Sequence, residues 1–159
     1  MTDPAASNVG AMPTRESRTA WDGGLQDGSG QVELSSSGLG TFDVSFPKRA
    51  SDENDGSVTT PEELLAASHS SCYSMALSNE IAQAGGTPIR SDVTAAVSLG
   101  PDPEGGFKIT AIKLTVRAEA EGIDDAAFQA AADKAKAGCP ISKALGGTAI
   151  TLDAALETA

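Results

Sequence analysis

The chain has 159 residues and a formal net charge of −11, with 40% hydrophobic residues but only 4% aromatic ones. That length fits one domain with a real core, packed mainly by Ala, Val, Leu and Ile. The negative charge disfavours nucleic acid and anionic membrane surfaces as partners, because both repel an acidic protein.

Residues 1–15 are predicted to form a disordered arm, and residues 16–159 a single domain. The first twenty residues lack the apolar core of a signal peptide, and no apolar run approaches membrane-spanning length. We therefore expect a cytoplasmic protein. In that reducing environment, cysteines are more often catalytic, redox-active or simply buried than joined in a permanent bridge.

Three short segments after the arm are predicted to be strands, namely 18–21, 30–34 and 40–46. Glycine-rich links join them, which favours an antiparallel meander. Pro47 ends the third segment, and the polar residues 48–60 that follow are typical of a loop.

Residues 60–84 are predicted to form a long helix that a Gly-Gly pair ends. Thr60 is a suitable N-cap and Pro61 suits the first helical position, while the two glutamates that follow favour the positive end of the helix dipole. Few polar groups other than serines lie between Leu64 and Leu77. The helix is therefore expected to be buried nearly all round.

The last third of the chain is predicted to contain a hairpin, a helix and a closing strand. Segments 91–99 and 107–118 alternate in polarity and form the hairpin, with a register irregularity near residue 111. Residues 124–137 form an Ala-rich amphipathic helix that a Cys-Pro pair breaks, and residues 148–154 form the strand. The whole is an α+β fold with largely antiparallel strands, a long buried central helix and a second helix.

Two cysteines, Cys72 in the long helix and Cys139 at the end of the second, are the main candidates for chemistry. Cys72 is either a small buried hydrophobe or a nucleophile, which must be a thiolate. Cys139 is either incidental to a helix end or a resolving thiol that attacks the oxidised first sulfur. A disulfide between them requires Cα atoms within about 7 Å.

A thiolate in an apolar helix needs a cationic neighbour, because burial alone raises the pKa of a thiol. His69 and Arg49 are the nearest candidates by sequence, and arginine is the better one because it stays charged. Glu62 is either a dipole-complementing helix starter or part of the site. It precedes Cys72 by ten residues, about 15 Å along the helix, so a direct role requires the partner chain or contact with Arg49.

A metal site is a rival hypothesis for the same residues. His69 lies one turn before Cys72, and Cys139 would supply a third soft ligand. With so few ligands, zinc is the weaker interpretation, and no cofactor or metal is expected.

Two motifs resemble those of the OsmC/Ohr family of thiol peroxidases. Residues 60–77 (TPEELLAASHSSCYSMAL) resemble its first cysteine motif, and residues 135–145 (AKAGCPISKAL) resemble its second. Lesser matches are Trp21-Asp-Gly and the closing Ala149-Ile-Thr-Leu-Asp153, so the likeness covers about residue 16 to the C-terminus. His69 and the Gly138-Cys-Pro turn make the chain more similar to the OsmC branch than to the Ohr branch.

The resemblance implies an intertwined homodimer of α+β subunits with two active sites at the interface. Cys72 matches the peroxidatic cysteine, which becomes a sulfenic acid, and Cys139 matches the resolving cysteine that closes an intramolecular disulfide. Glu62 matches the carboxylate that holds a catalytic arginine. Arg49 is assigned as that arginine, although Ala50 follows it where the family has phenylalanine, and Arg18 is the fallback.

The resemblance also implies organic hydroperoxides as substrates, with hydrogen peroxide a poorer one, in oxidative or osmotic stress defence. An apolar site would bind an alkyl tail by burial, which supports that preference. The reductant is expected to be a small thiol or a dihydrolipoyl group. The alternative is a non-enzymatic stress-induced binding or structural protein of the same fold, with idle thiols.

Overall fold

The structure, a computed structural model, describes residues 13–157, which form two compact units that meet in the sequence between Thr60 and Pro61. Most of the predicted N-terminal arm, residues 1–12, lies outside the described residues. The assignment of residues 16–159 to one domain stays a prediction.

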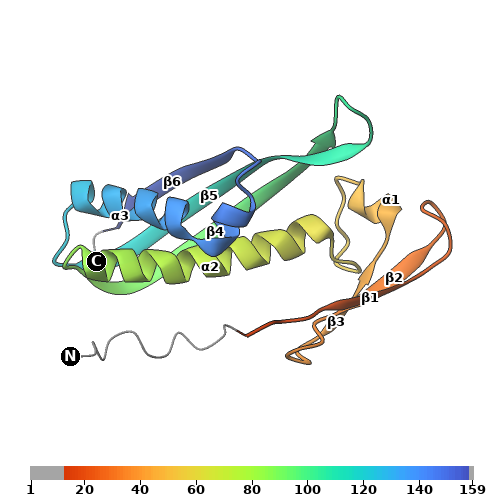
Figure 1. Ribbon diagram of the computed structural model, residues 1–159, viewed down its shortest axis with the longest axis horizontal. Helices are drawn as coiled ribbons and strands as arrows, with labels where there is room; N and C mark the ends of the chain where they lie inside the picture. The colour runs from red at the N-terminus through yellow and green to blue at the C-terminus, as the bar shows by residue number, and fades with distance from the viewer. Residues whose placement is uncertain (1–12, 158–159) are drawn as a thin grey trace, which may run out of the picture. The chain divides into compact units, whose positions relative to one another are not determined.

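The first unit contains the predicted meander. Strands β1 (Arg18–Asp22), β2 (Ser29–Glu33) and β3 (Thr41–Val44) form an antiparallel sheet in the order β1-β2-β3 (Figure 1). Val32 on the central strand pairs with Phe42 and is buried. The alternation of polarity and the short Gly-containing links therefore predicted both the pairing and its direction.

The third strand is shorter than predicted, because a one-turn helix, α1 (Phe46–Arg49), replaces its end. Ser45 is extended and its side chain accepts a hydrogen bond from the Lys48 N–H at 3.4 Å. Pro47 also suits the first turn of a helix. Capping and proline geometry thus outweigh the apolar alternation that favoured a strand, and Arg49 ends α1.

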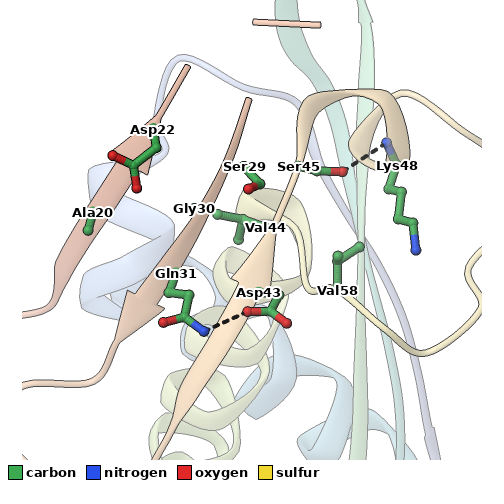
Figure 2. A pocket seen from close by; sticks show the side chains of 10 residues that line it. All are labelled: Ala20, Asp22, Ser29, Gly30, Gln31, Asp43, Val44, Ser45, Lys48 and Val58. Atoms are coloured by element: carbon green, nitrogen blue, oxygen red, sulfur yellow. Dashed lines mark hydrogen bonds between the residues drawn. The ribbon is translucent and has the colours of Figure 1, made fainter. Parts of the chain in front are cut away.

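A hollow of about 470 Å³ lies on this first unit, lined by residues of the three strands, Lys48 and Val58 (Figure 2). Among the lining residues, Gln31 donates to Asp43 at 2.8 Å. None of its lining residues is a cysteine or histidine, so the thiol chemistry expected of the chain lies elsewhere.

The second unit places two helices on one face of a three-stranded sheet (Figure 1). Its elements in chain order are α2 (Pro61–Gln83), β4 (Thr87–Pro101), β5 (Phe107–Glu121), α3 (Asp125–Gly138), α4 (Pro140–Ala144) and β6 (Ile150–Leu156). The β4–β5 hairpin is antiparallel, but β6 runs parallel to β5. The parallel pair follows from the crossover through α3 and α4, since parallel neighbours need a long connection.

The register irregularity predicted near residue 111 is confirmed. The β4–β5 pairing shifts between Ser98, which faces Ala111, and Leu99, which faces Ile109. Beyond the shift, Ile112, Leu114 and Val116 are buried. The shift explains why the apolar residues of β5 change phase along the strand.

The prediction that the long helix is buried nearly all round is wrong for this chain. His69, Tyr73, Leu77 and Ile81 recur every fourth residue and form one buried stripe of α2. Met75, on another side of the helix, is 69% exposed. Alanines and serines carry little polarity signal, so the larger side chains decide which face is buried.

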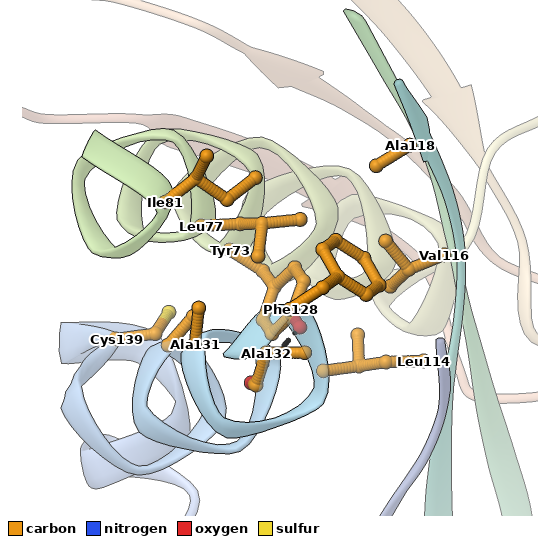
Figure 3. Close-up of a cluster of buried hydrophobic side chains, with 11 residues drawn as sticks. Tyr73, Leu77, Ile81, Leu114, Val116, Ala118, Phe128, Ala131, Ala132 and Cys139 are labelled. Atoms are coloured by element: carbon orange, nitrogen blue, oxygen red, sulfur yellow. Dashed lines mark hydrogen bonds between the residues drawn. The ribbon is translucent and has the colours of Figure 1, made fainter. Parts of the chain in front are cut away.

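The core of the second unit forms where α2, α3 and β5 meet (Figure 3). Phe128 and Tyr73 are fully buried within it, beside Ala131, Ala132 and Leu114. The Tyr73 hydroxyl donates to the Ala132 carbonyl at 3.0 Å, which satisfies its one polar atom. The sulfur of Cys139 lies at the edge of this cluster.

In the part of the chain that the structure describes, no helix combines the length and apolarity needed to cross a bilayer.

Candidate active site

The two cysteine sulfurs lie 3.0 Å apart, and both are free thiols. Cys72 comes from the middle of α2 and is partly buried. Cys139 comes from the junction of α3 and α4, 67 positions later in the chain, and is completely buried. The structure therefore brings together the two residues that the sequence analysis singled out, and a disulfide requires little movement of either side chain.

The junction between α3 and α4 holds Cys139 in place. The Cys139 N–H donates to the Ala135 carbonyl at 2.9 Å, and its own carbonyl accepts from the Lys143 N–H at 3.0 Å. Pro140 begins α4, which redirects the chain directly after the cysteine. One residue thus ends α3 and precedes α4, and both helices restrain the position of its sulfur.

The two thiols are close enough to share one proton. Burial raises the pKa of Cys72, and its contact with Cys139 raises it further. The Ile141 N–H acts in the opposite direction but does not outweigh them. Burial also acts to raise the pKa of Cys139. The net shift of that pKa is nevertheless downward, because hydrogen-bond donors stabilise the thiolate: the Cys72 thiol, the N–H and hydroxyl of Ser142, and the Ile141 N–H. These N–H groups act on the Cys139 sulfur electrostatically, although the Cys139 side chain makes no capping hydrogen bond at the start of α4. In the isolated reduced pair, the negative charge is therefore favoured on Cys139.

His69 is not the cation beside Cys72. The ring is fully buried, and burial lowers the pKa of His69, which keeps it neutral near pH 7. Its Nε2 atom lies 2.7 Å from the Ser142 hydroxyl oxygen of α4. Ser142 was not among the site residues predicted from the sequence; the signal that could have found it is its position one helical turn after Cys139 in a Cys-Pro-Ile-Ser stretch.

The other predicted site residues lie at defined places in the two units. Glu62 is in the first turn of α2 and only 9% exposed. Arg49 ends α1 and Arg18 begins β1, so both candidate arginines belong to the first unit. Their roles beside Cys72 stay predictions.

Among the described residues, no group of three or more His, Cys, Asp and Glu side chains is placed to hold a metal ion. His69 directs its Nε2 atom at Ser142, which leaves Cys72 and Cys139 as a two-sulfur site. Two neighbouring thiols and a neutral, engaged histidine suit redox chemistry better than tetrahedral coordination.

The family model described as "OsmC-like protein" matches residues 54–154. The chain belongs to the OsmC-like family. It is 40% identical to the peroxiredoxin OsmC of Escherichia coli over 144 residues, which are 91% of this chain and 97% of the relative. It is 32% identical to the organic hydroperoxide resistance protein OhrA of Bacillus subtilis over 79% of this chain and 85% of that protein.

Solved OsmC-like structures share the fold. An organic hydroperoxide resistance protein from Elizabethkingia anophelis matches with a TM-score of 0.69 and 28% identity, covering 91% of this chain and 99% of its own. One from Legionella pneumophila matches with a TM-score of 0.67 and 26% identity, covering 91% and 99%. The α+β class predicted from the sequence and the family resemblance are both confirmed.

Proposed function

We propose that this OsmC-like chain is a thiol peroxidase that reduces organic hydroperoxides in stress defence. The observation that carries the proposal is the pair of free thiols whose sulfurs lie 3.0 Å apart. The names of the relatives, a peroxiredoxin and organic hydroperoxide resistance proteins, support the same activity.

The proposed reaction has two sulfur steps. The Cys72 thiolate attacks the terminal peroxide oxygen, the O–O bond breaks, and Cys72 becomes a sulfenic acid as the alkoxide takes a proton and leaves as an alcohol. The Cys139 thiolate then attacks the Cys72 sulfur, the S–S bond forms, and hydroxide leaves and is protonated to water. A small thiol or dihydrolipoyl reductant restores both thiols by exchange.

Cys72 needs help to be the first nucleophile, because the reduced pair favours the charge on Cys139. In the proposed function, Arg49 supplies that help by stabilising the Cys72 thiolate, and Glu62 orients the guanidinium within the chain or across a homodimer. A positive charge beside a thiol moves the shared proton to the other sulfur and frees the nucleophile.

Arg49→Ala is expected to lower kcat/KM for cumene hydroperoxide by at least about tenfold, since an adjacent cation typically shifts a pKa by about 1–3 units. Arg49→Lys should recover part of the loss, because it keeps the charge but not the forked donors. Steady-state kinetics with Arg18→Ala as the matched control measures the effect. Loss of activity in Arg18→Ala with Arg49→Ala unaffected would transfer the role to Arg18.

An alkyl hydroperoxide is the proposed substrate class and hydrogen peroxide a poorer one, because only the former has a tail to bury. The reaction needs no cofactor. A thiol pair that returns to the reduced state after each cycle suits a reducing compartment, which supports a cytoplasmic location.

The test of the function is a thiol count after one equivalent of cumene hydroperoxide. We expect two thiols per chain to disappear and a Cys72–Cys139 disulfide to be found by peptide mapping, because the sulfurs are already adjacent. Retention of both thiols would instead support the idle-thiol alternative. Zinc in elemental analysis of the purified protein would support the metal hypothesis.

A further inference from the structure

Two polar contacts connect α2 to the α4 turn side by side. His69 and Cys72 lie one helical turn apart on α2, and Cys139 and Ser142 lie three residues apart at the start of α4. The contact from His69 Nε2 to Ser142 Oγ is 2.7 Å, and the contact between the cysteine sulfurs is 3.0 Å. The first turn of α4 therefore carries both the Cys139 sulfur, which contacts Cys72, and the Ser142 hydroxyl, which contacts the buried His69.

The direction of the histidine contact follows from its other nitrogen. His69 is 0% exposed, and its Nδ1 atom has no hydrogen-bond partner. An orphaned buried N–H is rarer and costlier than an unused acceptor, so the ring hydrogen is assigned to Nε2. Nε2–H then donates to Ser142 Oγ, which leaves the hydroxyl hydrogen of Ser142 available to a second acceptor, and Cys139 lies three residues earlier at the N-terminus of α4.

We propose that His69 and Ser142 are positioning residues for the resolving step: a relay from His69 Nε2–H through the Ser142 hydroxyl presents Cys139 to oxidised Cys72 as a thiolate. This inference rests on the proposed function, in which Cys139 attacks the Cys72 sulfenic acid. In that step the Cys139 sulfur forms the S–S bond as the S–O bond of Cys72 breaks. The proton that Cys139 held in the reduced pair goes to the leaving hydroxide, which departs as water, and the two sulfurs together neither gain nor lose electrons.

The surroundings of Cys139 agree with a charge on its sulfur. The Ser142 hydroxyl acts to lower the pKa of Cys139. Cys72 and Tyr73 of α2 act on it directly, His69 of α2 contacts Ser142, and Asp133 of α3 acts on Tyr73. Burial, Asp133 and Cys139 all raise the pKa of Tyr73, which keeps that hydroxyl neutral.

The relay acts oppositely on the two sulfur steps, and this makes it testable. Without the Ser142 hydroxyl, Cys139 is a weaker thiolate and closes the disulfide more slowly. The shared proton then returns toward Cys139, which leaves Cys72 at least as reactive toward peroxide. If Ser142 and His69 served only to maintain the fold, replacing either residue would slow both steps together.

Ser142→Ala is expected to slow disulfide closure about tenfold, the usual effect of losing one hydrogen bond to a charged group, while the first oxidation keeps its rate or quickens. Stopped-flow oxidation by one equivalent of cumene hydroperoxide resolves the two phases. Ser142→Thr keeps the hydroxyl and should restore closure. His69→Leu should slow closure as Ser142→Ala does, and His69→Gln, whose amide keeps an N–H, should recover part of the rate.

A second measurement does not depend on peroxidase activity. In a Cys72→Ser background, the ultraviolet absorbance of the thiolate against pH gives the acid dissociation constant of Cys139. Adding Ser142→Ala is expected to lower that constant about tenfold. An unchanged constant, or equal slowing of both oxidation phases, would overturn the relay. A wild-type protein that forms no Cys72–Cys139 disulfide would instead overturn the proposed function.

Discussion

Cys72→Ser is expected to reduce the turnover of cumene hydroperoxide to the background rate of the reductant alone. A serine hydroxyl is far less acidic than a thiol and cannot form the sulfenic acid on which the cycle depends. The Cys139 sulfur is fully buried, so it is poorly placed to replace Cys72 as the peroxide nucleophile. Peroxide consumption with a dihydrolipoyl reductant measures the effect.

Cys139→Ser is the matched control, since it removes the other sulfur of the same contact. It should still consume about one equivalent of peroxide, because Cys72 remains, but it should not recycle through a disulfide. Full peroxidase activity in Cys72→Ser would show that the mechanism proposed for this chain is wrong.

The largest loss of stability is expected from Phe128→Ala, at about 3–5 kcal/mol in the free energy of unfolding. Phe128 is 0% exposed and lies between α2, α3 and β5, so truncation leaves a cavity that these packed elements cannot readily fill. Urea denaturation followed by circular dichroism measures the change.

Phe107→Ala is the control, because the same truncation removes a side chain that is 61% exposed at the start of β5. Its cost should be at most about 1 kcal/mol. Equal costs for the two variants would mean that the cluster around Phe128 does not dominate the stability of the second unit.

Local signals predicted most of the fold. Alternating polarity located the strands, Asp124 caps α3 as its residue type suggests, and Gly85, with a φ of 88°, follows the end of α2. The two cysteine motifs identified the family. These features are readable because each depends on residues within a few positions of one another.

The features that sequence reasoning missed depend on contacts between distant segments or on weak side-chain signals. The parallel pairing of β6 with β5 is set by how α3 and α4 cross the sheet. The buried face of α2 could not be predicted because serines and alanines occur on every side of the helix. Only the larger side chains, such as Tyr73 and Leu77, mark the buried face. The contact of Ser142 with His69 joins residues 73 positions apart, so it forms only when α4 folds against α2.

The 3.0 Å separation of the sulfurs has a further consequence for damage by excess peroxide. Groups held in attacking geometry behave as if present at effective molarities of about 10⁵ M or more. A sulfenic acid on Cys72 would therefore be captured internally before a second peroxide could drive it to the irreversible sulfinic state. Under the proposed function, the chain is built to survive sudden peroxide loads and keep cycling, and inactivation by overoxidation should appear only when Cys139 is absent.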